Sequence, residues 1–227
     1  MSGIFFDSST LISMATTCSL PVLRKLRQAY GDNFYITNSV YEETIGRAMH
    51  SLRFRYEGYR LKELIDDGIL KIYPDSQLRG QVNEMLTFIN ATYFASGRPI
   101  TIVQPGEIST IVASVRENAD TFAVDERTAR LLIENPSALK PWLEHKLHTT
   151  ITVNSKTMTQ WSSKISEKFI PLRSAEFALA AWEKGIFGND PDVLFGLLWA
   201  LKFAGCAITE EEINFYMRKT GNRNGQT

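Results

Sequence analysis

Short apolar runs that alternate with helical hydrophobic patterns constrain the fold of this chain more than any other feature of its sequence. The runs are three to five residues long and lie at residues 4–6, 34–36, 69–73 and 121–124. Between them, apolar residues recur at the spacing of a helix with one buried face, as in the series Ile108, Ile111, Val112 and Val115. Strands that alternate with helices in this way favour an α/β fold with a mostly parallel central sheet.

The last third of the chain has a different pattern. Residues 149–153 alternate weakly and are predicted to form the last strand. Helical patterns then follow at residues 156–167, 174–185 and 191–204. Thr209, with Glu212 three residues later, has the spacing of a capping box and predicts a final short helix. We therefore expect an α/β domain over residues 1–155 and a helical extension over residues 156–227 that packs on it.

The composition limits the kinds of protein that this chain can be. Its 25 basic and 25 acidic residues give a formal net charge of zero, so any contact with nucleic acid must be made by a local patch. Hydrophobic residues make up 44% of the chain, which excludes disorder over its whole length. The motifs of P-loops, dinucleotide-binding folds and serine-hydrolase elbows do not occur. The sequence has no apolar run of roughly 18 residues and no secretory signal pattern, so we expect a cytoplasmic protein without membrane contacts.

Two acidic residues stand at the ends of predicted strands. Asp7 follows the run at 4–6, and Asp125 follows the run at 121–124. Neighbouring strands lie roughly 4.7–4.9 Å apart, so the two carboxylates would share one cleft if their strands are adjacent. A hard divalent cation such as Mg²⁺ or Mn²⁺ would relieve their repulsion. The alternative is that each Asp only caps the helix that follows it.

Two further acids are candidates for the same cleft. Glu107 lies in the first turn of a helix that begins at Pro105, and it borders the buried face of that helix. Of Glu42 and Glu43, which are about 100° apart around a helix axis, at most one points into a cleft. The alternatives are that Glu107 only complements the helix dipole and that Glu42 and Glu43 form a solvated face.

The order of these features resembles the PIN domain, a family of metal-dependent nucleases. The matching segments are "IFFDSSTLI", "ITNSVYEET", "GEISTIVAS" and "ADTFAVDERTAR", which together cover roughly residues 3–135. The resemblance implies a three-layer PIN-like fold in which four acids hold Mg²⁺ or Mn²⁺. Carried over position by position, these acids are Asp7, Glu43, Glu107 and Asp125. Ser8 would orient a carboxylate or a water molecule.

The resemblance also implies an activity and partners. The expected activity is metal-dependent endonucleolytic cleavage of single-stranded RNA, as in the toxins of toxin–antitoxin pairs. The partners that it implies are RNA, a second copy of the chain in a homodimer, and a small antitoxin protein. The alternative is a non-catalytic PIN-fold module that binds RNA or a protein partner without cutting.

A basic and aromatic stretch directly follows the second acid. It carries Arg53, Arg55 and Arg60, with Phe54 and Tyr56 between them. Such a stretch would hold a phosphodiester backbone through its arginines while an aromatic ring stacks on a base. The alternative is that the aromatic residues belong to the core and the arginines form a solvated face.

Overall fold

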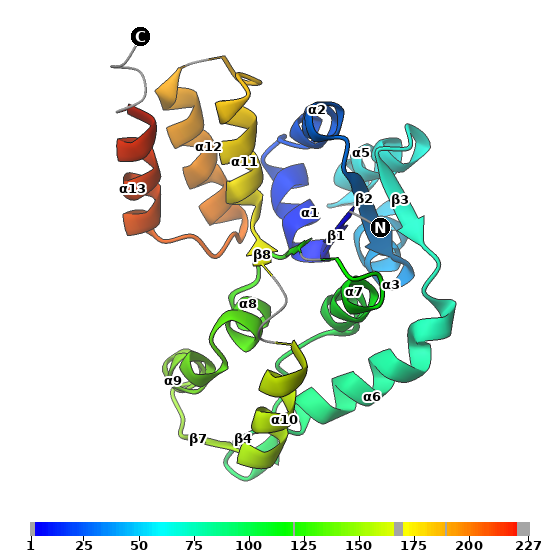
Figure 1. The fold of residues 1–227 in the computed structure, drawn as a ribbon, viewed down its shortest axis with the longest axis vertical. Coiled ribbons are helices and arrows are strands. Elements are labelled where there is room, and N and C mark those ends of the chain that lie inside the picture. The colour runs from blue at the N-terminus through cyan, green and yellow to red at the C-terminus, as the bar shows by residue number, and fades with distance from the viewer. Residues whose placement is uncertain (1–2, 120, 166–169, 189, 222–227) are drawn as a thin grey trace.

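The computed structural model describes residues 3–119, 121–165, 170–188 and 190–221. A five-stranded sheet with the order β3-β2-β1-β6-β8 crosses its centre, and each of its pairings is parallel (Figure 1). The strands are β1 (Gly3–Phe6), β2 (Asn33–Thr37), β3 (Leu70–Tyr73), β6 (Thr121–Ala123) and β8 (Ile170–Leu172). The predicted α/β class with a mostly parallel central sheet is therefore confirmed.

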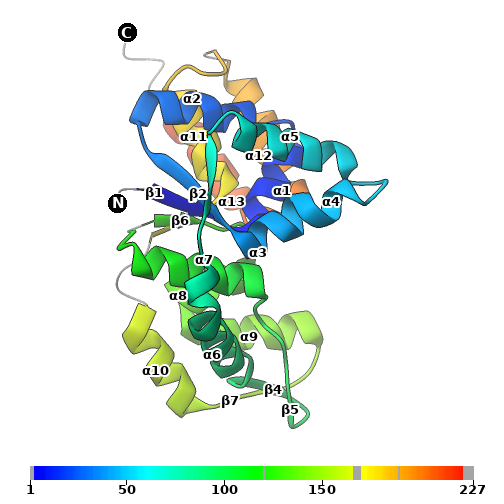
Figure 2. The ribbon, with the colours of Figure 1, turned by 90° about the vertical axis from the view of Figure 1, so that its right-hand side faces the viewer.

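Helices cover both faces of this sheet, which explains why its strands read as continuous apolar runs (Figure 2). Successive side chains of a strand point to opposite faces, so Phe5 joins the core on one side of the sheet and Phe6 the core on the other. Phe122 and Ala123 divide in the same way. Because both faces of the inner strands β1, β2 and β6 are covered, the polar alternation of a half-buried strand is absent from them. The edge strand β3 differs, since Lys71 and Ile72 are exposed.

The Phe6 side of the sheet is covered mainly by helices from the amino-terminal half of the chain. These are α1 (Ser8–Thr16), α2 (Pro21–Tyr30), α3 (Asn38–Tyr41), the π-helical turn η1 (Glu42–Gly46), α4 (Arg47–Met49) and α5 (Arg55–Asp66). The Phe5 side is covered by helices from the middle of the chain. These are the short turn η2 (Ser76–Leu78), α6 (Arg79–Asn90), α7 (Pro105–Arg116), α8 (Arg127–Glu134), α9 (Pro136–Leu147) and α10 (Ser155–Ile165).

The strand predicted at residues 149–153 does not belong to the central sheet. It forms β7 (Ile151–Val153), which pairs antiparallel with β4 (Tyr93–Ala95). Together with β5 (Arg98–Pro99), these strands make a small three-stranded sheet at the far end of the helices on the Phe5 side (Figure 2). Hydrophobic alternation predicts the strand itself, but it does not encode which neighbour the strand will pair with.

The fifth strand of the central sheet is β8, for which the sequence gives little signal. It contains Pro171, which cannot donate to a sheet ladder and argues against a strand. The residue is tolerated because β8 lies at the edge of the sheet beside β6. The boundary predicted at residue 155 therefore does not coincide with the end of the sheet.

The rest of the carboxyl-terminal region is helical, as predicted. It comprises α11 (Ser174–Glu183), α12 (Pro191–Ala204) and α13 (Glu210–Gly221), which share a small core of their own. The capping box of α13 is present, since Thr209 Oγ1 accepts from Glu212 N and Glu212 Oε2 accepts from Thr209 N. Residues 166–167 of the predicted 156–167 helix, and residues 222–227 of the extension, lie outside the described residues. Within the described ranges, no helix has the length and apolar character needed to cross a membrane.

Candidate active site

Asp7 lies at the carboxyl end of β1, beneath the start of α1. Its side chain is 1% exposed and caps α1, since Oδ2 accepts from Ser9 N at 3.0 Å and from Ser9 Oγ at 2.6 Å. Its other oxygen, Oδ1, is buried and has no hydrogen-bond partner in the described structure. Helix capping thus accounts for only one of the two oxygens. A buried carboxylate oxygen without a donor is costly, so its retention needs a further explanation.

Glu43 lies beside this unpartnered oxygen. A β-carbon built on Gly106 would lie 2.9 Å from Glu43 Oε2 and 3.9 Å from Asp7 Oδ1, so both oxygens border the same point in the first turn of α7. Gly106 provides the space for the two carboxylates, because a larger residue at this position would displace Glu43. Segments that are nearly 100 residues apart in the sequence thereby meet at one place.

The sequence leaves a choice between Glu42 and Glu43, which the local helix geometry resolves. Thr37, at the end of β2, caps α3 and so starts this helix at the carboxyl edge of the sheet. The π-helical turn η1 follows, and π turns are frequent at functional sites. Glu42 is exposed and folds back over Gly46, where an added β-carbon would lie 2.5 Å from Glu42 Oε2. Glu43 is the one that is half-buried and borders Asp7.

Glu107 completes a group of three acids. Its Oε2 accepts from Gln104 N at 2.6 Å, the backbone half of a capping box at the start of α7. Burial raises the pKa of Glu107 to about 9, and the negative charges of Asp7, Glu126 and Glu43 add to that shift. Burial likewise raises the pKa of Asp7 to about 6, against the opposing hydrogen bonds from Ser9 and with a contribution from Glu43. These acids are therefore electrostatic neighbours.

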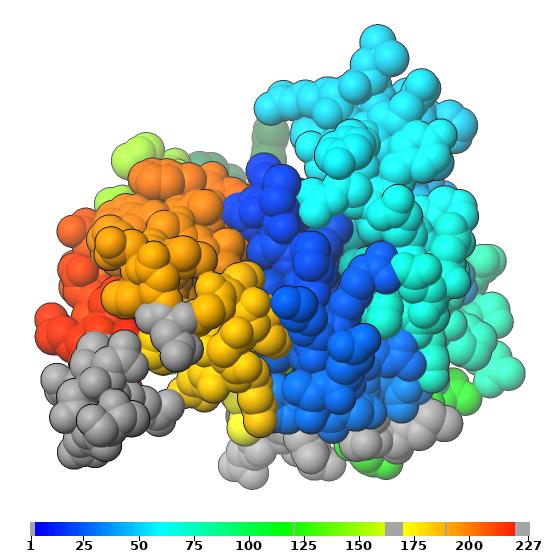
Figure 3. All heavy atoms as spheres, turned by 90° about the horizontal axis from the view of Figure 1, so that it is seen from above, coloured from blue at the N-terminus to red at the C-terminus, as the bar shows by residue number. Residues whose placement is uncertain are grey.

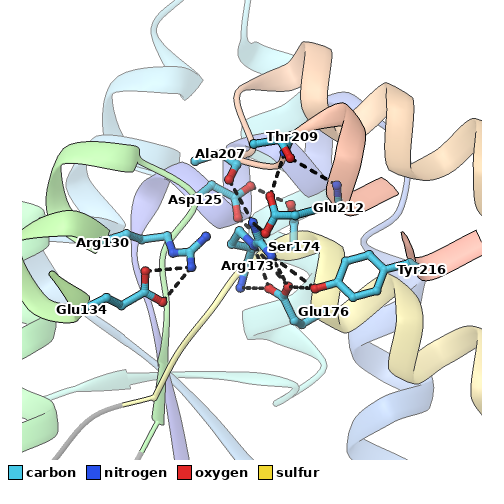
Figure 4. Close-up of polar contacts among 10 residues, drawn as sticks. All are labelled: Asp125, Arg130, Glu134, Arg173, Ser174, Glu176, Ala207, Thr209, Glu212 and Tyr216. Atoms are coloured by element: carbon cyan, nitrogen blue, oxygen red, sulfur yellow. Dashed lines mark hydrogen bonds and ion pairs between the residues drawn. The ribbon is translucent and has the colours of Figure 1, made fainter. Parts of the chain in front are cut away.

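The hydrogen bonds of the Asp125 carboxylate are made with residues other than Asp7, Glu43 and Glu107. Asp125 follows β6 as predicted, but its Oδ1 accepts from Ser174 N at 2.7 Å and its Oδ2 from Ser174 Oγ at 2.6 Å. Both oxygens are thus directed at the first residue of α11, and Figure 4 shows this contact. The side chain next along the chain, Glu126, is the one that contributes to the raised pKa of Glu107. The metal-ligand role predicted for Asp125 has no support from these contacts, which give it a structural role.

Asp125 is part of the joint that fastens the last three helices to the sheet. Beside it, Arg173 is 4% exposed and forms ion pairs with Glu176 at 2.6 Å and with Glu212 at 2.9 Å. Arg173 also donates to Tyr216 Oη and to the carbonyl of Ala207 (Figure 4). A buried arginine with several acceptors joins the start of α11 to α13.

Ser9 takes the role that the sequence prediction gives to Ser8. The Ser9 hydroxyl donates to Asp7 Oδ2 at 2.6 Å and accepts from Asp125 N at 3.0 Å. It therefore ties the ends of the neighbouring strands β1 and β6 and fixes the orientation of the Asp7 carboxylate. Ser8 is a buried residue whose backbone N–H helps to hold the pKa of Asp7 down. A Ser two residues after a helix-capping Asp commonly donates to that Asp, and this spacing could have identified Ser9 from the sequence.

A hollow of about 630 Å³ opens beside Glu43. Glu43 and Gly106 lie on its wall, together with the side chains of Arg47 and Arg79. Two cations on the wall of a site that is otherwise acidic are suited to holding a phosphate group. Arg47 is the first residue of the basic stretch in the sequence, whereas the wall does not include Arg53, Arg55 or Arg60, the arginines predicted to bind nucleic acid.

The three predicted arginines lie on the outer side of this region. Arg55 Nε donates to the carbonyl of Met49 at 3.0 Å, and Arg60 Nη1 donates to the carbonyl of Ala15 at 3.2 Å. Arg53 lies over the ring of Phe54, 5.0 Å from its centroid. The alternative in which the aromatic residues of this stretch are core is wrong, because Phe54 is 48% exposed and Tyr56 is 72% exposed.

The fit of a divalent cation to this site rests on the chemistry of the donors. Among the residues that the structure describes, no three His, Cys, Asp or Glu side chains are placed to hold one metal ion together. Asp7, Glu43 and Glu107 nevertheless offer only oxygen donors, which hard cations prefer. The unpartnered Oδ1 of Asp7, with a Glu43 oxygen beside it, is the buried group that such a cation would satisfy.

Comparisons with known proteins provide no relative for this chain. No protein family, curated protein or solved structure matches it.

Proposed function

We propose that this protein is a Mg²⁺- or Mn²⁺-dependent endoribonuclease with a PIN-like fold that hydrolyses phosphodiester bonds in single-stranded RNA. The observation that carries the proposal is the buried, unpartnered Oδ1 of Asp7, which borders the same point as Glu43 Oε2. A buried carboxylate with a half-buried one beside it is unfavourable unless a cation binds between them. The family resemblance of the sequence supports the same chemistry.

Each residue of the site has a part in this proposal. Asp7, Glu43 and Glu107 would hold the cation, which when bound supplies a Lewis acid that makes water more acidic and neutralises charge on the phosphate. Ser9 keeps the Asp7 carboxylate in one orientation through two hydrogen bonds. Arg47 and Arg79 bind the phosphodiester from the wall of the hollow and fix the strand across the acids.

Cleavage of a labelled single-stranded RNA in the presence of Mn²⁺ tests the proposal. The native protein should cut the RNA, and chelator should stop the reaction. Asp7→Asn should lower the rate by at least about a hundredfold, since loss even of groups that support metal ligands costs roughly 10–100-fold in metal affinity or activity. Asp66→Asn is the matched control, because Asp66 forms an exposed ion pair with Lys62 away from the site.

The same experiment separates the catalytic proposal from the non-catalytic alternative. Contacts of the fourth predicted acid, Asp125, favour that alternative, since they leave one acid fewer for a metal. A protein that binds the RNA but leaves it intact with Mn²⁺ and with Mg²⁺ would establish the binding module. Cleavage that persists unchanged in Asp7→Asn would remove these acids from the mechanism.

A further inference from the structure

A second hollow lies on the other side of Glu43. It has a volume of about 270 Å³ and is formed where α1, η1, α4 and α5 meet. Glu43 and Arg47 line both this hollow and the larger one beside the acids, so the two are neighbours. Small-molecule sites commonly measure roughly 300–1,000 Å³, so this hollow lies just below that range and holds one ring system at most.

The walls of this hollow are largely apolar and include an aromatic ring. Ile12, Leu61 and Phe54 line it, and Ile12 and Phe54 are 42% and 48% exposed. Phe54 is the residue that directly precedes α5. Figure 3 shows the cyan segment that contains the start of this helix projecting beyond the blue segment of α1. An exposed aromatic ring on the wall of a hollow is a platform on which a flat ring can stack.

One polar group in this hollow has no protein partner. Glu57, on α5, lines the hollow, and its Oε2 is buried with no hydrogen-bond partner among the described residues. Gly58 allows the close approach that places Glu57 there, since a β-carbon at Gly58 would lie 3.0 Å from Ala48 Cβ. A buried carboxylate oxygen without a donor marks a place where a ligand N–H would be stabilising.

We infer that this hollow binds a guanine base of the RNA strand next to the phosphate that is cut. A carboxylate only accepts hydrogen bonds, so it selects a ring edge on which N–H donors are adjacent. Guanine presents two neighbouring donors, its ring N1–H and its exocyclic amine. Uracil has a single N–H between two carbonyls, whereas adenine and cytosine place a ring acceptor beside their amine. Phe54 stacks on the base, and Glu57 accepts from its edge.

This inference rests on the proposed function for the position of the scissile phosphate, but its test needs no cleavage. Binding of the four nucleoside 5′-monophosphates is measured in chelator at one ionic strength, by titration calorimetry or by nuclear magnetic resonance. The native protein should prefer guanosine monophosphate over the other three by about tenfold or more, since one bidentate base contact discriminates by roughly 5–150-fold.

Two variants locate the contact. Glu57→Gln has the same size and should reduce the preference to less than about threefold, because an amide replaces one acceptor with a donor. Glu63→Gln is the matched control on the exposed face of the same helix and should leave the preference unchanged. Equal affinity for the four nucleotides, no binding, or an unchanged preference in Glu57→Gln would each overturn the inference.

The cleavage assay and the binding assay together show which of the two proposals fails, the nuclease activity or the guanine site. A guanine preference that depends on Glu57, in a protein that cuts no RNA, would keep the base site and reject the nuclease. Metal-dependent cleavage with no base preference in binding or in cut positions would keep the nuclease and reject the base site.

Discussion

Replacing Asp7 by Asn should stabilise the protein in the absence of metal. The Asp7 side chain is 1% exposed, and one of its oxygens has no donor in the described structure. Asn keeps an oxygen that accepts from Ser9 N and Ser9 Oγ, and Asn and Asp are about equally good helix N-caps. The substitution therefore removes a buried charge and leaves the local fold of α1 intact.

The size of the effect follows from the pKa of Asp7. Burial raises this pKa from 3.8 to about 6, in spite of the hydrogen bonds from Ser9. At about 1.4 kcal/mol per unit, the charge costs about 3 kcal/mol of unfolding free energy at neutral pH. This pKa already includes the effect of the hydrogen bonds from Ser9, so no further correction for them is needed. A gain of about 3 kcal/mol corresponds to a Tm increase of roughly 6–12 °C for a chain of this size.

Thermal unfolding in chelator, recorded from pH 4 to pH 8, measures this gain. Asp7 has a raised pKa when folded, so its penalty is complete above about pH 6 and declines as pH falls toward 3.8. The difference in Tm between Asp7→Asn and the native protein should follow the same course. Adding Mn²⁺ should raise the Tm of the native protein more than that of the variant, since binding to the folded state alone is stabilising.

Asp125→Asn is the matched substitution at a second buried Asp. The Asp125 carboxylate accepts from Ser174 N and Ser174 Oγ with both of its oxygens, and an amide cannot accept with both. The Tm of Asp125→Asn should therefore fall. A lower Tm for Asp7→Asn at pH 7.5, or a difference that does not change with pH, would show that the charge of Asp7 does not destabilise the folded protein.

Three further predictions concern the same molecule. Gly106→Ala places a β-carbon 2.9 Å from Glu43 Oε2, so it should abolish the rise in Tm that Mn²⁺ causes. The Tm in chelator, measured by differential scanning fluorimetry, should stay within about 2 °C of the native value. Burial raises the pKa of Glu107 to about 9, so the native protein in chelator should become more stable as pH falls from 9 toward 5. Glu107→Gln should reduce this pH dependence of the unfolding free energy, measured by urea denaturation. Arg173→Met removes the ion pairs of a buried arginine with the partly exposed Glu176 and Glu212, so it should lower the unfolding free energy by about 2 kcal/mol, measured by the same denaturation. A loss below about 1 kcal/mol would show that Arg173 is not the joint between α11 and α13.

The sequence predicts the class of the fold because a strand that is buried on both faces of a sheet consists of consecutive apolar residues. Each strand of the parallel core except β8 reads as a short apolar run, and the helices between them show the periodicity of one buried face. Local signals also fix the ends of helices, as with Thr209 and Glu212 at α13. Pairing partners are not encoded in this way. The strand predicted as the last one forms β7 and pairs with β4, whereas β8 pairs with β6 and completes the central sheet.

The candidate site shows the same division between sequence and structure. Residue type and position after a strand identify Asp7 and Asp125 equally well, because both follow apolar runs and both precede helices. The structure gives them different environments: the carboxylate of Asp125 faces the start of α11, whereas Asp7 keeps one oxygen free beside Glu43. Arg47 and Arg79 come from separate helices, and both line the hollow.

Periodicity and capping are properties of neighbouring residues, and they are enough to predict the parallel α/β class and most helix boundaries of this chain. Other features emerge only when the chain is folded: which acids lie close together, which one anchors the last three helices, and the position of the unpartnered Glu57 oxygen beside an aromatic wall. Those facts depend on which of several distant segments come within hydrogen-bond distance, and local patterns carry no information about that choice.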